Sequence, residues 1–152
     1  DVDAIVAWQP SSGQALSLVP GSKAIYTSAD EPGLIYDLLA VSPESLAARR
    51  DDWKKVIDVW YRAVAYLKDP KTTDDAVKIM ASRVGLDAAE YKPFLKGTYI
   101  LTRDEANKFM VKGDGFKSIY GSTKISDDFN VANKVYAEPQ VVDDYIDGSL
   151  MK

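Results

Sequence analysis

Two short polar segments near the start of the chain carry the side chains best suited to binding a small molecule. The candidate residues are Trp8, Gln9, Ser11, Ser12, Thr27, Ser28, Asp30 and Gly33. Serine hydroxyls and free backbone N–H groups at the start of a helix form a ready anion site. An indole beside them offers an apolar wall, and an aspartate after the second segment offers a partner for an amine. The chemistry predicted here is therefore binding, with no group transfer.

Ordinary structural roles are the alternative for the same residues. Trp8 also suits a core tryptophan that precedes a turn, and one of the two serines suits a plain helix cap. Asp30 also suits a residue that shapes the turn before Pro32-Gly33. Both interpretations stay open from the residues alone.

Patterns that resemble catalytic motifs lack the context that their chemistry requires. Tyr120 and Lys124 have the Y-x-x-x-K spacing of a nicotinamide-dependent acid/base pair. That chemistry needs a glycine-rich dinucleotide turn after a first strand, and the sequence has none. Residues 113–118 nearly match G-x-G-x-x-G but follow a helical stretch. Asp127-Asp128 is an adjacent pair that is expected to be structural or solvated.

The composition excludes several classes of function. The chain has no Cys and no His, so we expect no thiolate or imidazole catalysis, no Cys/His metal site and no cofactor held by such ligands. The net charge of −4, with Lys and Arg scattered among acids, argues against a nucleic-acid partner. No apolar run approaches the ~20 residues of a membrane span.

Three segments are predicted to be strands, at 2–8, 23–27 and 34–41, because each is a short run rich in apolar residues. About six helices are predicted to follow. Ser42 with Pro43 marks a helix start, and a long helix is expected from Asp51 to the residue before Asp69-Pro70. Trp53 and Trp60 are expected to pack in the core from that helix.

Further helix boundaries follow from local signals. Gly85 is expected to end a helix that begins near Thr73. The pairs Asp87 with Glu90 and Thr102 with Glu105 have the capping-box spacing. A last helix is expected to carry Ile125, Phe129, Ala132 and Tyr136 along one apolar face.

These elements predict an α/β fold in which few strands are packed by about six helices, as a single domain over residues 1–152. Three strands are few for so many helices. We therefore expect residues outside this chain to complete the sheet.

The order of several segments resembles the C-terminal portion of periplasmic solute-binding proteins of the nitrate/sulfonate/taurine type, which feed ABC importers. The segment VDAIVAW-Gln9-Pro10 resembles the point where a strand of the second lobe crosses the hinge, although Gln9 stands where relatives often carry Glu. SADEPGLIYD (28–37) and the helix at 51–68 resemble the segments that follow, as do Gly97-Thr98-Tyr99 and the segment 120–124.

The resemblance implies a binding protein that is not an enzyme, built as a periplasmic-binding-protein-like lobe. Residues 1–10 or so would end the second lobe and cross the hinge, and residues 11–152 or so would form the C-terminal part of the first lobe. It further implies a periplasmic location, a membrane permease as partner, and capture of a small polar or anionic solute by hinge closure. The candidate residues would form one wall of the cleft, and exposed sheet edges would favour self-association. Because the chain begins with Asp1, a processed product or a fragment is expected.

Two other functions remain open. One is a regulatory domain of the same fold that senses a metabolite. The other is an enzyme of the pyrimidine-precursor type, which the absence of histidine disfavours.

Overall fold

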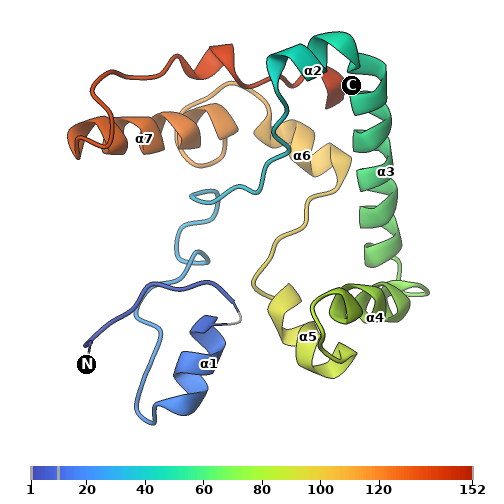
Figure 1. Ribbon diagram of the computed structural model, residues 1–152, viewed down its shortest axis with the longest axis vertical. Helices are drawn as coiled ribbons and strands as arrows, with labels where there is room; N and C mark the ends of the chain where they lie inside the picture. Colours follow the sequence, from blue (N-terminus) through green and yellow to red (C-terminus); the bar gives the residue numbers. More distant parts are fainter. Residues whose placement is uncertain (1, 10, 152) are drawn as a thin grey trace.

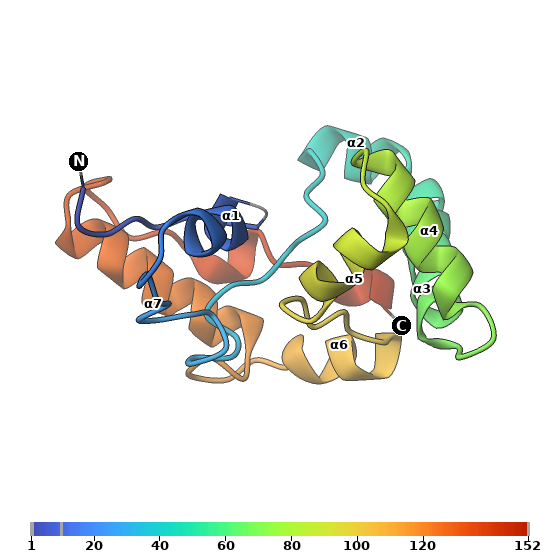
Figure 2. The ribbon, with the colours of Figure 1, turned by 90° about the horizontal axis from the view of Figure 1, so that it is seen from below.

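The computed structural model describes residues 2–9 and 11–151, and all regular structure in these residues is helical. The elements in chain order are α1 (Ser11–Leu18), α2 (Pro43–Ala48), α3 (Arg50–Lys68), α4 (Thr73–Arg83), α5 (Ala88–Leu95), α6 (Arg103–Phe109), α7 (Ile119–Ala132) and the short 3-10 helices η1 (Val142–Asp144) and η2 (Ser149–Met151). Figures 1 and 2 both place α7 on one side of the molecule and α3 with α4 on the other.

The predicted α/β class, with a periplasmic-binding-protein-like lobe, is wrong for the described residues. Residues 2–8, 23–27 and 34–41 form no strand and no bridge, and most of their side chains are exposed. A strand exists only through hydrogen bonds to a neighbouring strand, and within residues 2–9 and 11–151 none of these segments has one. The sheet edges invoked for self-association are therefore also missing from this part of the chain.

The predicted helix starts at Ser42, Asp87 and Thr102 are confirmed. Ser42 accepts a hydrogen bond from the Ser45 backbone N–H at 3.2 Å and caps α2, with Pro43 at the first helical position. Both capping boxes are formed, by Asp87 with Glu90 at α5 and by Thr102 with Glu105 at α6. Such caps satisfy N–H groups that the helix itself leaves without partners.

Glycine at position 85 ends α4 as predicted. Its φ of +71° continues the chain in the left-handed region after the C-cap residue Val84. The Leu86 N–H then donates to the Ala81 carbonyl oxygen at 3.1 Å, which satisfies a carbonyl group at the helix end.

The main core lies where α3 packs against α4, α2 and η2, and where α4 packs against α5. Val64 on α3 and Ala76, Val77 and Ala81 on α4 are buried there. Small side chains on α4 allow the two helices to approach closely, so apolar burial holds this half of the molecule together.

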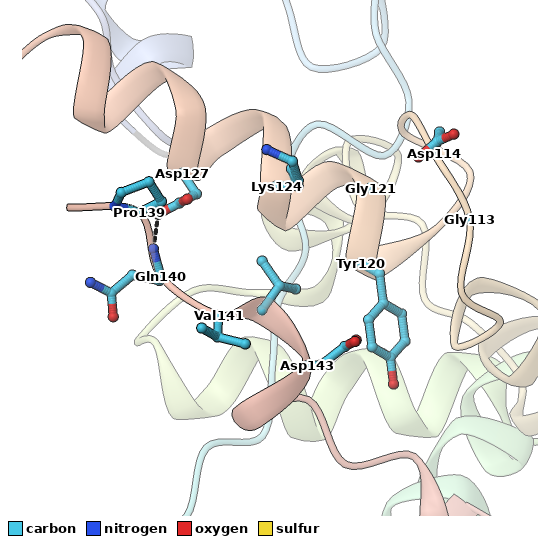
Figure 3. Close-up of a pocket in the computed structure, with 11 residues that line it drawn as sticks. Gly113, Asp114, Tyr120, Gly121, Lys124, Asp127, Pro139, Gln140, Val141 and Asp143 are labelled. Atoms are coloured by element: carbon cyan, nitrogen blue, oxygen red, sulfur yellow. Dashed lines mark hydrogen bonds between the residues drawn. The ribbon is translucent and has the colours of Figure 1, made fainter.

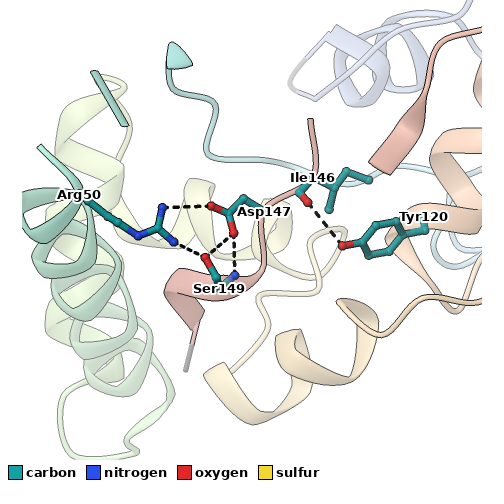
Figure 4. Close-up of polar contacts among 5 residues, drawn as sticks. All are labelled: Arg50, Tyr120, Ile146, Asp147 and Ser149. Carbon is teal, nitrogen blue, oxygen red and sulfur yellow. Dashed lines mark hydrogen bonds and ion pairs between the residues drawn. The ribbon is translucent and has the colours of Figure 1, made fainter. Parts of the chain in front are cut away.

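The C-terminal segment fastens onto α3 through η2. Leu150 is buried, and the Arg50 guanidinium contacts both Asp147 and Ser149, as Figure 4 shows. On the α7 side of the same segment, the Tyr120 hydroxyl donates to the Ile146 carbonyl oxygen at 3.4 Å. Residues 142–151 therefore join α7 to the α3 core.

Much of the apolar face of α3 remains uncovered. Trp53 is half-buried and donates its indole N–H to the Ser45 hydroxyl at 3.1 Å. Trp60 is 57% exposed, with Val56 and Val59 exposed beside it. The prediction of core packing is therefore wrong for Trp60, because the structure covers only part of the helix's broad apolar arc.

Among the described residues, no helix combines the length and the hydropathy that crossing a membrane would demand.

Candidate functional site

The first predicted cluster lies at the entry to α1. Trp8 is 71% exposed, Gln9 and Ser11 are exposed, and Ser12 is half-buried. The Ser12 N–H donates to the Trp8 carbonyl oxygen at 3.0 Å, so the indole-bearing residue belongs to the turn that opens the helix. These four residues are neighbours in the chain at the start of α1, and all except Ser12 are exposed to solvent.

The second predicted cluster is a turn closed by its own aspartate. The Thr27 backbone N–H and hydroxyl donate to Asp30 Oδ2 at 2.6 and 2.9 Å, and the Asp30 N–H donates to the Thr27 carbonyl oxygen. The hydrogen bonds from the Thr27 backbone and side chain lower the pKa of Asp30. This geometry matches the turn-shaping role. Ser28 is exposed within the same turn.

Gly33 has a structural contact that the sequence did not indicate. Its φ is +92°, and a Cβ there would overlap the Phe116 carbonyl group. Its own carbonyl oxygen accepts a hydrogen bond from the Ser122 hydroxyl at 2.7 Å. Gly33 therefore anchors the N-terminal third of the chain to α7.

A depression of about 300 Å³ lies beside α7 and contains none of the eight predicted residues. Figure 3 shows it between α7, the loop before α7 and the segment that leads into η1. Its lining comprises Gly113, Asp114, Tyr120, Gly121, Lys124, Asp127, Pro139, Gln140, Val141, Val142 and Asp143. The predicted ligand-binding residues therefore stay a prediction, and this depression is a separate candidate site.

The first turn of α7 positions one wall of the depression. Ser118 caps the helix by accepting from the Tyr120 N–H at 3.2 Å, and its hydroxyl donates to the Val111 carbonyl oxygen at 2.7 Å. A Cβ at Gly121 would overlap the backbone of Asp114 and Gly115. Only glycine lets the 113–115 loop lie directly against the helix here.

Asp127 is the most buried charged residue of the site, at 3% exposed. Its Oδ1 accepts from the Tyr136 hydroxyl at 2.7 Å and from the Gln140 backbone N–H at 3.0 Å. The first of these hydrogen bonds raises the pKa of Tyr136, because the carboxylate favours the protonated phenol. Asp127 thereby holds the returning chain at 136–140 against α7.

Two lysines near the depression have carboxylate partners. Lys124 Nζ lies 2.7 and 2.8 Å from the two oxygens of Asp128, and this hydrogen bonding raises the pKa of Lys124. Lys112 Nζ lies 2.8 Å from Asp143 Oδ2, which raises the pKa of Lys112, and it also lies 5.4 Å from the Tyr120 ring centroid. Both ammonium groups are therefore stabilised in the charged form.

The nicotinamide-type interpretation of Tyr120 and Lys124 gains no support from this geometry. The Tyr120 hydroxyl donates to the Ile146 carbonyl oxygen, whereas Lys124 is held by Asp128. Within residues 2–9 and 11–151, no group of three acidic side chains is placed to hold a metal ion.

Sequence reasoning assigned Asp127 only a structural or solvated role, and the burial of this residue beside the depression was missed because the prediction relied on the helical periodicity of apolar residues. The face predicted to be apolar and inward is exposed: Phe129 is 63% exposed, and Ile125 is exposed as well. The buried face instead carries Gly121, Ser122 and Asp127, and α7 ends before Tyr136. Asp127 and Tyr136 lie nine residues apart, and no local sequence pattern at that spacing predicts their contact.

Comparisons with protein-family models, with curated proteins and with solved structures found no match to this chain.

Proposed function

We propose that the chain is part of the solute-binding component of an ABC importer for a small polar or anionic solute of the nitrate/sulfonate/taurine class. The support comes from the order of its sequence segments, from the polar segment around Trp8 to the helix at 51–68. The proposal rests on these residues and on their accessibility.

The exposure of Trp8 carries the proposal. Its indole is 71% exposed at the point where the chain enters α1, with Ser11 and Ser12 in the first turn. Tryptophan is enriched at interfaces, where a partner covers the apolar ring. Serine hydroxyls and the N–H groups of an opening helix turn attract an anionic group. Together they suit a solute with an anionic group and an apolar part.

The turn at 27–30 has a supporting role in this proposal. Because Thr27 occupies Asp30 Oδ2, the turn stays closed and presents Ser28 to solvent. We expect the Ser28 hydroxyl to bind the solute and Asp30 to hold the turn in shape.

The test is titration calorimetry of the chain, and of the longest form of the protein that contains it, with nitrate, methanesulfonate and taurine. We expect Trp8→Ala and Ser28→Ala each to weaken binding of the bound solute by about tenfold or more. Trp60→Ala on α3 and Ser82→Ala on α4 are matched controls, since both side chains are exposed on helices outside the proposed site. Unchanged affinity in both test variants would show that this site assignment is wrong.

A further inference from the structure

The buried carboxylate of Asp127 has one oxygen without a protein partner. Both of its hydrogen bonds end on Oδ1. No donor among the described residues reaches Oδ2, and that oxygen is open to solvent, because no fully enclosed side-chain polar atom in this part of the chain lacks a partner. Asp127 is one of the residues that line the depression beside α7.

The Asp127 carboxylate can accept a further donor. An ionised carboxylate accepts up to about four hydrogen bonds, and the described residues supply two, both to Oδ1. The nearest lysine on α7 is Lys124, but Asp128 holds its Nζ through both oxygens. The Lys124 ammonium group is therefore not a hydrogen-bond donor to Asp127 Oδ2.

The charge around the depression favours a cation. Asp114, Asp127 and Asp143 line it with only one lysine, Lys124. The ion pairs of Lys124 with Asp128 and of Lys112 with Asp143 leave Asp114 and Asp127 as the excess acids. Pro139, Val141 and Val142 supply an apolar surface on the opposite wall. A ligand that fits has an N–H-bearing cationic head and a short apolar part.

We propose that this depression binds a small organic cation with N–H donors, an ammonium or guanidinium compound, through Asp127 Oδ2. The volume of about 300 Å³ is at the lower limit of ligand pockets, so the ligand is small. This site is independent of the proposed solute site, because the two share no residue.

The Gln140 backbone amide gives a direct readout. Its N–H donates to the same carboxylate at 3.0 Å, so its NMR shift responds when a cation binds Oδ2. The chain is titrated with methylguanidinium chloride, and separately with tetramethylammonium chloride, at constant ionic strength. We expect a saturable shift of Gln140 with methylguanidinium, and at least about tenfold weaker binding of tetramethylammonium, which has no N–H.

Variants decide whether Asp127 is the binding group. We expect Asp127→Asn to weaken methylguanidinium binding by about tenfold or more, whereas Asp104→Asn makes the same charge change on α6 and leaves the affinity within about twofold. We expect Lys124→Ala to strengthen binding by about threefold, because it removes the nearest competing positive charge. Lys78→Ala on α4 is its control.

Three results would overturn the proposal: no saturable shift of Gln140, equal binding of both cations, or equal affinity of Asp127→Asn and the parent chain. If circular dichroism shows that Asp127→Asn does not fold, the comparison of Lys124→Ala with Lys78→Ala tests the site instead. Equal affinity of Lys124→Ala and Lys78→Ala then rejects the site.

Discussion

The Ser122 hydroxyl donates a 2.7 Å hydrogen bond to the Gly33 carbonyl oxygen and so connects residues 89 positions apart. Ser122 is buried on α7, and Gly33 lies in the irregular segment between α1 and α2. Tyr36 reinforces the contact, since its hydroxyl donates to the Phe116 carbonyl oxygen at 2.8 Å. These hydrogen bonds tie the N-terminal third of the chain to α7.

We expect Ser122→Ala to lower the free energy of unfolding by about 1 kcal/mol, because it leaves the Gly33 carbonyl oxygen without its donor in a half-buried place. Chemical denaturation measures this. Ser17→Ala is the control, since the Ser17 hydroxyl bonds only the Gly13 carbonyl oxygen on the exposed side of α1. Equal losses in both variants would contradict an anchoring role for Ser122.

Gly33 and Gly21 form a matched pair for measuring the close approach to Phe116. Both have φ near +90°, but a Cβ at Gly21 meets no atom within 4 Å. We expect Gly21→Ala to cost about 1 kcal/mol for the backbone conformation alone, and Gly33→Ala to cost roughly 2 kcal/mol more. Thermal and chemical unfolding check the difference. Similar costs would mean that the 30–36 segment moves away without penalty.

The lowered pKa of Glu105 predicts that the folded state loses stability in acid. Hydrogen bonds from the Thr102 backbone, Tyr99 and the Thr102 side chain lower its pKa from 4.5 to about 2. A depressed folded-state pKa contributes stability above the unfolded value, and this contribution disappears as the pH falls from about 4.5 toward 2. We expect Glu105→Gln to remove that part of the pH dependence in unfolding measured over this range.

The control for Glu105 is Asp104→Asn, which makes the same charge change one residue earlier on α6. We expect the acid-dependent loss to persist in this variant. A parent-like pH profile in Glu105→Gln would show that the capping box at Thr102 does not control acid stability.

We predict that Arg50 holds the C-terminal segment against α3. Its guanidinium contacts Asp147 and Ser149 across the interface between α3 and η2. We expect Arg50→Ala to speed hydrogen exchange in residues 147–151, with a loss of less than about 1 kcal/mol in global stability, because the pair is partly exposed. Arg49→Ala is the matched control, since Arg49, the N-cap residue of α3, pairs among the described residues only with Asp52 in the first turn of that helix. Equal exchange in both variants would show that Arg50 does not hold residues 147–151 in place.

Helix ends could be predicted because their signals are local. Ser42 before Pro43, Thr102 before Glu105, and Gly85 each act through atoms within one turn of the chain. The candidate binding residues could be proposed from their types alone, and their accessibility agrees with that proposal without testing it.

The sequence by itself determined the helices with their caps and, through the absence of Cys and His, the chemistry the chain lacks. Only the tertiary structure decided the rest. Within residues 2–9 and 11–151, no neighbouring strand pairs with residues 2–8, which therefore form none, and no element covers the side of α3 that carries Trp60. Asp127 is buried because residues 136–140 return to α7. Each outcome depends on contacts between distant segments, which a local pattern does not encode.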